Sequence, residues 1–343
     1  VLKNLNDSYH SYYNSFFSHI YVEKSVINHP RTKQLMEKFP EAEIIEIVHY
    51  KDVFCRSRQY TAGQHRAQQL ILAAKKNNFI YEGAPVCQSF GNDYFYYTSC
   101  MMNCVFDCEY CYLKGMYPSG NVVIFVNLED FFAQVEKILE KHEVYLCVSY
   151  DTDLMAVENI AGYTEEWVDF AKRHSGLKIE IRTKSANKSF ISRIDAAENV
   201  IYAFTLSPQP VIESFEHRTA PLKSRLECAA LAISRKMKVR LAFDPMIYCK
   251  DWREAYREMF EQVCESIDFD SLLDVSVGTF RVSAEYLKKM KKQEPYSPAV
   301  QFPFENDSGF YHYPRELMLE MENEMVSLLK QKIPENKIFL WEN

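Results

Sequence analysis

Residues 97–112 read Tyr97-Thr-Ser-Cys100-Met-Met-Asn-Cys104-Val-Phe-Asp-Cys108-Glu-Tyr-Cys111-Tyr112. Cys104, Cys108 and Cys111 have the spacing C-x3-C-x2-C and follow a strand-like aromatic segment, residues 93–98. Three thiolates this close in the chain can each bind one iron of a cubic 4Fe-4S cluster and leave the fourth iron without a protein ligand. Such a cluster can bind and reduce a cofactor such as S-adenosylmethionine (SAM), whereas a fully ligated cluster only transfers electrons.

A structural zinc site is the alternative interpretation of these cysteines. Such sites usually take four ligands, often as two pairs with C-x2-C or similar spacing. Cys100 could supply a fourth ligand, but the sequence contains no second pair of this kind. Cys100 and Cys104 do not begin a second copy of the motif either, because Asp107 stands where its third cysteine would be. The spacing therefore favours the open cluster.

The composition indicates the size and class of the protein. With 343 residues, 47% of them hydrophobic, the chain can form one large domain, or one domain with an extension. No run of about eighteen apolar residues occurs, and the first residues, Val-Leu-Lys-Asn-Leu-Asn-Asp, do not resemble a signal peptide. We therefore predict a soluble, cytoplasmic protein without a membrane partner. Its ten cysteines then indicate a metal or redox site rather than a disulfide scaffold.

The net charge of −7 does not fit a generally basic nucleic-acid-binding protein. Two local groups of basic residues are still candidates for DNA contact, although either group can also be an ordinary solvated surface. Their members are Arg56, Arg58, Arg66, Lys75 and Lys76 in the first group, and Lys288, Lys289, Lys291 and Lys292 in the second.

Apolar runs alternate with helical patterns from residue 93 onward, which predicts βαβ units and a mainly parallel sheet. The expected strands are 93–98, 122–127, 144–150, 178–183, 200–206, 238–244 and 272–281. The expected helices are 128–141, 163–174, 221–236 and 251–266, with Asn127 and Asp251 as N-caps of the first and the last. Six or seven such units fit an α/β fold, an open, incomplete β/α barrel, with its chemistry at the C-terminal ends of the strands.

The remaining segments predict additions at both ends of this barrel. Residues 42–50 are strand-like, and residues 60–74 read as a helix. A long amphipathic helix at 314–331 and a final strand at 337–341 read as a cap. We therefore divide the chain into an N-terminal α/β extension (1–90), a barrel (91–285) and a C-terminal helix-strand cap (286–343).

The order of several short motifs resembles the spore photoproduct lyase family of radical-SAM DNA repair enzymes, most closely its clostridial branch. The resemblance runs from about Tyr50 to the end of the chain. Its landmarks are the cysteine loop with Tyr112-Leu113, then Val126-Asn-Leu-Glu129, Thr183-Lys184, Phe204-Thr-Leu-Ser207, Glu216-His-Arg-Thr219, Pro245 and Trp252.

The resemblance implies a fold, two cofactors and a reaction. The fold is the open partial (β/α)6-type barrel of radical-SAM enzymes, and the cofactors are a 4Fe-4S cluster on Cys104, Cys108 and Cys111 and a SAM molecule bound to its open iron. The reaction is the light-independent repair of the spore photoproduct, a thymine dimer in DNA, through a 5'-deoxyadenosyl radical. The implied electron donor is a flavodoxin or a ferredoxin.

The same resemblance assigns roles to single residues. Tyr110 would lie against the adenine of SAM, Lys184 would bind its carboxylate and Ser207 its ribose. Asp151 or Asp153 would receive the amino group of SAM. Ser149, at the end of the expected strand 144–150, is a further candidate for cofactor binding. Tyr112 is a candidate catalytic residue.

The hydrogen donor to the product radical has two candidates. In the family, the residue that resembles such a donor is a cysteine in a C-T-S-D stretch, at the strand end that corresponds to the end of the expected strand 144–150 here. Aligning C-x-S gives Cys147, whereas aligning the final Ser-Asp with Thr152-Asp153 puts Tyr150 there and leaves the cysteine missing. The alternative for Cys147 is a buried core thiol, which is a common place for free cysteine.

Two other functions stay open at this point. The acidic net charge and the unsettled donor fit a radical-SAM enzyme that acts on a peptide or a small molecule. A metal-stabilised binding module without catalysis would explain the cysteines, but not Lys184, Ser207 and the strand-helix order together.

Overall fold

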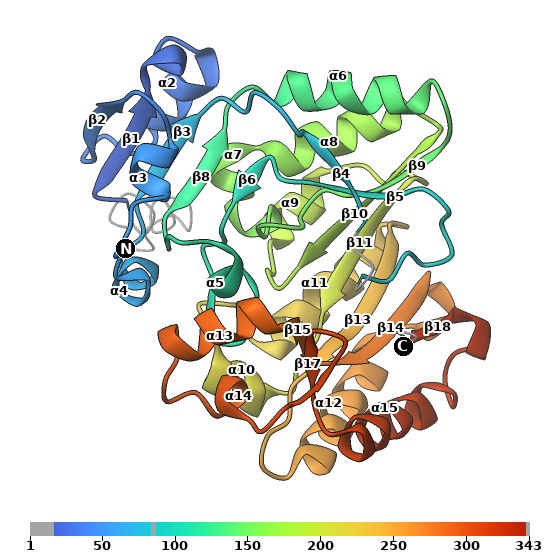
Figure 1. Cartoon of the computed structure of the whole chain (residues 1–343). Coiled ribbons are helices and arrows are strands. Elements are labelled where there is room, and N and C mark those ends of the chain that lie inside the picture. Colours follow the sequence, from blue (N-terminus) through green and yellow to red (C-terminus); the bar gives the residue numbers. More distant parts are fainter. Residues whose placement is uncertain (1–16, 84–86, 341–343) are drawn as a thin grey trace, which may run out of the picture.

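The computed structural model describes residues 17–83 and 87–340, and it shows two mainly parallel sheets with helices around them (Figure 1). The larger sheet has eight strands in the order β18-β14-β13-β11-β10-β9-β5-β4. Six successive neighbours are parallel: β5 (Phe95–Thr98), β9 (Val144–Cys147), β10 (Leu177–Thr183), β11 (Val200–Thr205), β13 (Lys238–Met246) and β14 (Asp274–Thr279).

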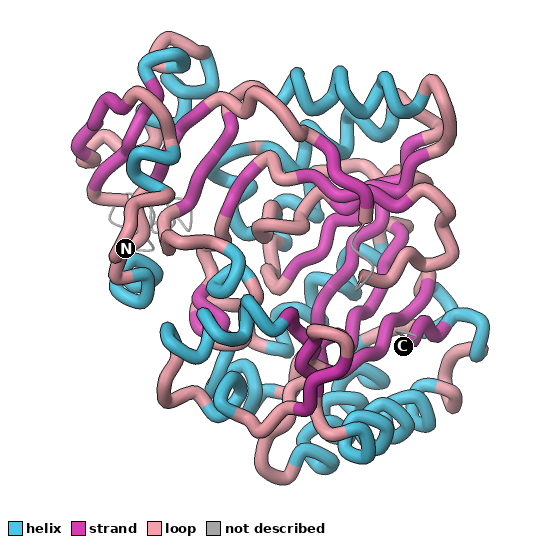
Figure 2. Tube along the Cα trace, in the orientation of Figure 1, coloured by secondary structure: helices cyan, strands magenta, loops and turns pink. Residues whose placement is uncertain are grey.

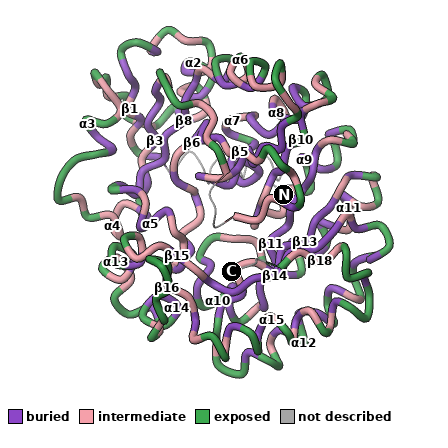
Figure 3. Tube along the Cα trace, turned by 45° about the vertical axis from the view of Figure 1, so that its right-hand side comes forward, coloured by how far each residue is buried: buried purple, intermediate pink, exposed green. Residues whose placement is uncertain are grey.

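Helices between these strands make the crossovers that parallel pairing requires. They are α6 (Leu128–Leu139), α8 (Tyr163–Lys172), α9 (Lys188–Arg193), α11 (Leu222–Ser234) and α12 (Trp252–Ser266). All residues of β9, β11 and β14 are buried, and this sheet is drawn largely as buried in Figure 3. Near-continuous burial is typical of parallel strands covered by helices. The predicted (β/α)6 arrangement is confirmed.

Two shorter strands extend the edges of this sheet. β4 (Ile80–Glu82) pairs antiparallel with β5, and β18 (Ile338–Leu340) pairs parallel with β14. The predicted final strand, 337–341, is confirmed within residues 338–340, and its last residue, Trp341, lies outside the described residues.

The smaller sheet, at the left of Figure 1, has the order β2-β1-β3-β8-β6. Its strands are β1 (His19–Glu23), β2 (Glu43–Ile47), β3 (Leu70–Ala73), β6 (Met101–Met102) and β8 (Val122–Phe125). We expected residues 122–127 in the barrel, and that placement was wrong. An apolar run predicts a buried strand but does not identify its neighbour, and here β8 pairs in parallel with β3.

The predicted helix over residues 60–74 was also wrong in its second half. Helix α4 (Thr61–Arg66) ends early, and Leu70–Ala73 form strand β3. All four residues of β3 are buried between β1 and β8. A short apolar run is compatible with both a helix and a buried strand, and the strands on both sides decide between them.

The predicted N-caps stand at the right positions but do not cap. Asn127 precedes α6, yet its side chain bonds to the backbone N–H and C=O of Lys75 and so joins the ends of β8 and β3. Asp251 precedes α12 in a left-handed conformation, with φ of 55°, and makes no capping hydrogen bond.

The C-terminal segment adds helices and a small antiparallel sheet. The predicted strand 272–281 is interrupted: β14 ends at Thr279, whose N–H and hydroxyl donate to Glu322, and a new strand follows. The added elements are β15 (Arg281–Ser283), α13 (Ala284–Gln293), α14 (Pro298–Gln301), β16 (Glu305–Asp307), β17 (Phe310–His312) and α15 (Arg315–Leu329). Helix α15 confirms the amphipathic helix predicted for residues 314–331, and Figure 2 shows these elements in the lower half of the molecule.

The division of the chain at residues 90 and 285 stays a prediction. Strand pairing crosses residue 90 twice, because β3 pairs with β8 and β4 pairs with β5. In the described part of the chain, no helix has both the length and the hydropathy needed to span a bilayer.

A buried ion network joins β10, β13 and β14. Arg240 is 1% exposed; its Nη2 donates to Asp274 Oδ2 at 2.7 Å, and its Nη1 donates to Glu180. Burial alone would raise the pKa of the Glu180 carboxyl, but Arg182 and Arg240 outweigh burial and lower its pKa to about 2. The Glu180 carboxyl is therefore ionised at neutral pH.

We predict that Arg240→Ala strongly destabilises the fold, because it leaves the carboxylates of Glu180 and Asp274 buried beside one cation fewer. Removing one member of a buried ion pair costs about 3–5 kcal/mol. Urea denaturation measures the loss. The control is Arg253→Ala, which breaks the exposed pair with Glu320 and should cost at most about 1 kcal/mol.

The pH dependence of folding stability tests the same network independently. The pKa of Glu180 is lower in the folded protein, so its contribution to stability is present above its ordinary pKa of 4.5 and is lost as the pH falls toward 2. Arg240→Ala should weaken this acid dependence. Equal stability of the variant and the control would contradict the prediction.

Candidate active site

Tertiary contacts shape the cysteine loop, which has little secondary structure of its own. Strand β7 (Asp107–Cys108) pairs with β12 (Glu216–His217), and the one-turn helix α5 (Leu113–Met116) follows the third cysteine. Gln68 donates to the Cys104 carbonyl at 2.8 Å. Asn103, with φ of 65°, donates to two carbonyls of the segment that leads into β8. Both amides hold the loop against the smaller sheet.

A cavity of about 760 Å³ lies at the C-terminal ends of the barrel strands. The last residues of four strands line it: Cys147, Thr183, Thr205 and Thr279. All three motif cysteines line it as well: Cys104, Cys108 and Cys111. The structure thus brings the predicted ligands to the end of the barrel where the fold predicts chemistry.

The cysteines fit a cluster better than a single metal ion. All three are free thiols. Among the described residues, no three His, Cys, Asp or Glu side chains converge tightly enough for one ion. A cubic cluster does not need such convergence, because each thiolate binds a different iron. Cys100, the possible fourth ligand, is fully buried in the core and is not part of the cavity lining.

Burial keeps the three thiols protonated when nothing is bound. It raises the pKa of Cys108 to about 12, and it also raises the pKa values of Cys104 and Cys111. The ammonium of Lys184 acts against the rise at Cys108 and Cys111. Because thiolates are the metal-binding form, cluster binding at this site must release protons.

Glu216, next to the cysteine loop, is a fully buried carboxylate with partners from several elements. It accepts hydrogen bonds from Tyr110 in the cysteine loop, from Lys184 Nζ at 2.9 Å, from Ser207 Oγ at 2.7 Å and from Arg225 on α11. Burial alone would raise the pKa of Glu216, but Lys184 and Arg225 outweigh it and hold the pKa well below its usual range. Sequence analysis did not identify this central role.

The residues expected to bind SAM are therefore close together but only partly exposed to the cavity. Tyr110 and Lys184 line it, whereas Ser207 is 1% exposed and lies behind Glu216. Asp153 lines it and accepts from Thr183 and from the Lys184 N–H.

Ser149 and Asp151, the other two candidates that follow β9, differ in position. Ser149 lines the cavity and bonds to the backbone of Arg182. Asp151 lies outside the lining and accepts from Ser99 and Tyr117. The roles of these residues toward SAM stay predictions.

The candidate hydrogen donors lie on one wall of the cavity. Cys147 ends β9, and burial raises its thiol pKa well above the usual range. The ring of Tyr150 stacks on Tyr97 with 4.1 Å between centroids, and Tyr112 donates its hydroxyl to the Tyr150 carbonyl at 2.5 Å. Tyr112 and Tyr150 therefore both line the site.

Sequence analysis missed a second thiol on this wall. Cys87 lines the cavity, and its Sγ–H donates to the Tyr150 hydroxyl at 3.6 Å. Cys87 lies in a segment without a strand or helix pattern, 63 residues from Tyr150, so no sequence signal could have found the contact.

Charged residues also line the cavity close to these thiols, and Glu180 on β10 pairs in register with Cys147 on β9. Arg182 donates to Glu180 at 3.1 Å and lies 3.9 Å from Asp244, which also pairs with Arg281 at 3.4 Å. These residues were likewise missed. The cavity thus combines thiols and aromatic rings with paired charges.

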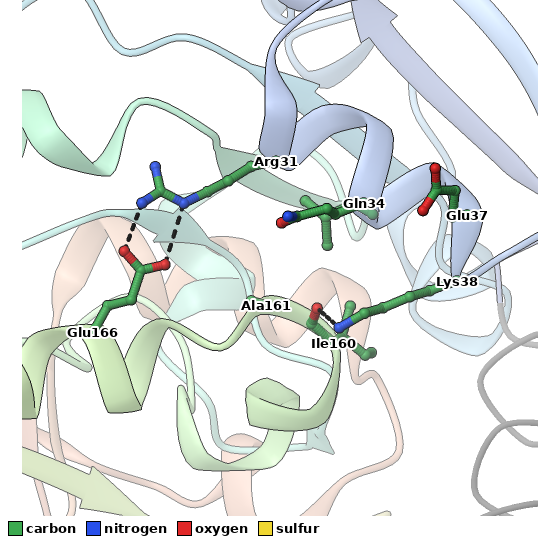
Figure 4. A pocket seen from close by; sticks show the side chains of 8 residues that line it. Arg31, Gln34, Glu37, Lys38, Ile160, Ala161 and Glu166 are labelled. Atoms are coloured by element: carbon green, nitrogen blue, oxygen red, sulfur yellow. Dashed lines mark hydrogen bonds and ion pairs between the residues drawn. The ribbon is translucent and has the colours of Figure 1, made fainter.

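A smaller pocket of about 350 Å³ lies between α2 (Pro30–Glu37) and the segment formed by α7 (Glu158–Ala161) and α8 (Figure 4). Its cations already have partners: Arg31 pairs with Glu166 and Glu129, and Lys38 donates to the Ile160 carbonyl at 2.7 Å. We interpret it as the joint between the N-terminal segment and the barrel.

Comparison with known proteins gives one family. The family model described as spore photoproduct lyase matches residues 16–340. A spore photoproduct lyase of Clostridium acetobutylicum is 21% identical over 332 residues, covering 90% of this chain and 94% of that protein. The Bacillus subtilis enzyme of the same name is 21% identical over 313 residues, 86% of each chain.

Solved structures confirm the fold. Spore photoproduct lyase complexed with dinucleoside spore photoproduct matches with a TM-score of 0.81 at 18% identity, covering 96% of this chain and 99% of that one. A double mutant of spore photoproduct lyase with bound AdoMet and dinucleoside spore photoproduct matches with a TM-score of 0.78, also at 18% identity, covering 95% and 98%. From its match to the family model over nearly its whole length, this chain belongs to the spore photoproduct lyase family.

Proposed function

We propose that this chain is a radical-SAM lyase that splits the spore photoproduct, a thymine dimer in DNA, without light. One observation carries the proposal: the three motif cysteines share a cavity of about 760 Å³ with Tyr110, Lys184 and Asp153 at the strand ends of a (β/α)6 barrel. Family membership supports the reaction, and a solved relative binds AdoMet and the dinucleoside lesion in the same fold.

The residues present fit both cofactors. Cys104, Cys108 and Cys111 would hold the 4Fe-4S cluster, and Lys184 and Asp153 offer a cation and a carboxylate to the carboxylate and amino groups of SAM. When bound, cluster and SAM together supply the 5'-deoxyadenosyl radical. Release of Lys184 from Glu216 toward SAM would leave Glu216 with Arg225, so the buried carboxylate would keep a cation.

The other residues of the cavity would hold the lesion and return hydrogen to it. Tyr150 and Phe280 line the cavity with aromatic rings against which thymine bases can pack. Burial keeps the thiols of Cys87 and Cys147 and the phenol of Tyr150 protonated, because it raises each pKa. A protonated thiol can donate a hydrogen atom, and the contact of Cys87 with Tyr150 makes these two a donor pair.

The proposal also includes contact with DNA, an external electron donor and a cytoplasmic location. Exposed basic residues on the segment from α3 (Lys51–Phe54) to α4 and on α13 support contact with the DNA backbone: Arg56, Arg58, Arg66, Lys288, Lys289 and Lys292. Lys75, by contrast, packs 5.0 Å from the Tyr81 ring centroid. A flavodoxin or ferredoxin would supply the electron, and a reducing cytoplasm suits the ten cysteines.

We predict turnover of the lesion by the reconstituted protein. The protein is loaded with iron and sulfide without oxygen and then mixed with dithionite, SAM and an oligonucleotide carrying the spore photoproduct. Mass spectrometry should show 5'-deoxyadenosine and repaired thymine rising together. Deoxyadenosine without repair would point to another substrate, such as a peptide or a small molecule, and neither product from a protein with a reducible cluster would refute the proposal.

We predict that Cys104→Ala, Cys108→Ala and Cys111→Ala each abolish iron binding and deoxyadenosine formation, because a cluster on this loop depends on all three thiolates. Cys249→Ala, outside the cavity lining, is the matched control and should bind iron like the unmodified protein. Iron and sulfide analysis measures the result. Full iron content in any of the three variants would exclude that cysteine as a ligand.

We predict that Cys87→Ala uncouples SAM cleavage from repair by about tenfold or more, because the product radical loses its hydrogen source while the cofactor site is intact. Cys147→Ala is the parallel variant on the same wall. The measurement is the ratio of repaired thymine to 5'-deoxyadenosine. If only Cys147→Ala lowers this ratio, Cys147 is the donor, and if neither variant does, Tyr150→Phe tests the phenol itself.

A further inference from the structure

Lys114 is a buried cation directly behind the cysteine loop. It lies on α5, three residues after Cys111, and is 3% exposed. It is not part of the cavity lining, so it does not face a substrate. Its ammonium lies 2.6 Å from Asp107 Oδ1 and 2.5 Å from Glu294 Oε1. Asp107 stands directly before Cys108, and Glu294 directly follows α13, so Lys114 links the loop to the C-terminal segment.

The pair with Asp107 is an ionic contact more than a directed hydrogen bond. Asp107 Oδ1 is buried, and among the described residues no donor is aligned with it. His65 Nδ1 lies 3.9 Å away, but burial lowers the pKa of this imidazole to about 4, so it is neutral. Lys114 is therefore the cation that balances Asp107.

The helices α5 and α13 are held in direct backbone contact. A Cβ on Gly115 would lie 2.5 Å from the Cα of Tyr286, so only glycine permits this approach. Gln293 donates to the Lys114 carbonyl at 2.5 Å. The first residues of α13, Ala284 to Tyr286, line the cavity, whereas its last residue holds α5. One helix thus contacts both the cavity and the support of the cysteine loop.

We propose that Lys114 is a positioning residue that fixes the cysteine loop against the C-terminal segment and makes reduction of the cluster easier. This inference rests on the cluster proposed for Cys104, Cys108 and Cys111. Reduction adds one electron, and thus one negative charge, to a group in a buried site. A nearby buried cation stabilises that charge more strongly than a solvated one does, because the interior screens poorly. The potential of such clusters depends on local charge and on hydrogen bonds.

Two substitutions separate a charge effect from a loosened loop. Lys114→Met keeps the length of the side chain and removes the positive charge, so the midpoint potential of the cluster should become more negative. Glu294→Gln keeps an acceptor for Lys114 and removes a negative charge, so the potential should become less negative. A purely structural role would move both variants in the same direction. Lys188→Met, which breaks an exposed pair with Glu227, is the matched control.

The measurement is a redox titration of the reconstituted proteins followed by electron paramagnetic resonance, together with iron and sulfide analysis. For Lys114→Met we expect a shift of about 59 mV, which equals a tenfold change for a one-electron couple. Lys114→Arg keeps the positive charge, so its cluster should have the same midpoint potential as that of the unmodified protein. Unchanged potentials in both Lys114→Met and Glu294→Gln, or shifts of the same sign, would overturn the inference.

The outcomes also separate this inference from the proposed function. An unmodified protein that binds no iron would refute the function itself, whereas one with a normal cluster and insensitive variants would refute only the role of Lys114. If Lys114→Met does not fold, the midpoint potential of Glu294→Gln decides the inference. A less negative potential supports it, and an unchanged or more negative potential overturns it. If Lys114→Met folds but binds less iron than the control, the positioning role is confirmed and Glu294→Gln decides the charge effect.

Discussion

The buried carboxylate of Glu216 is the charge on which the geometry of the site depends. A carboxylate without water is costly unless cations and donors surround it. Here they come from three other segments: Tyr110 from the cysteine loop, Lys184 from the end of β10, and Arg225 from α11. Glu216 is also paired in register with Cys108. The position of this cysteine is therefore set by charge pairing in the barrel as well as by the loop that carries it.

The repeating part of the fold could be predicted from the sequence because each strand-helix unit has its own periodicity. The six barrel strands and the helix now seen as α15 were predicted in this way. The partners of a strand are not encoded in its periodicity. Residues 122–125 pair with Leu70–Ala73, far earlier in the chain, and this pairing also decides that residues 70–73 form a strand and not the end of a helix.

The residues of the site also fall into those that local sequence features predict and those that depend on contacts between distant segments. Cysteine spacing and strand ends are local features, so Cys104, Cys108, Cys111, Cys147 and Lys184 were identified and indeed line one cavity. The groups that orient them were not, because those contacts join distant segments. Glu216 is 106 residues from Tyr110, and Glu294 is 180 residues from Lys114. The hydrogen bond from the buried Ser207 hydroxyl to Glu216 could not be predicted from the sequence either, and the role of Ser207 toward the ribose of SAM stays a prediction.

The cysteine loop is held from two sides by charge, and this arrangement suits a site that must bind a large group without collapsing. Its own regular structure is a two-residue strand and one helical turn, too little to fix three thiols independently. Glu216 anchors it to the barrel through Tyr110 and β12, and Lys114 anchors it to the C-terminal segment through Asp107 and Glu294. Neither anchor uses a cysteine side chain. The thiols therefore stay available to a cluster while the backbone around them is already ordered, which lowers the conformational entropy that cluster binding would otherwise cost.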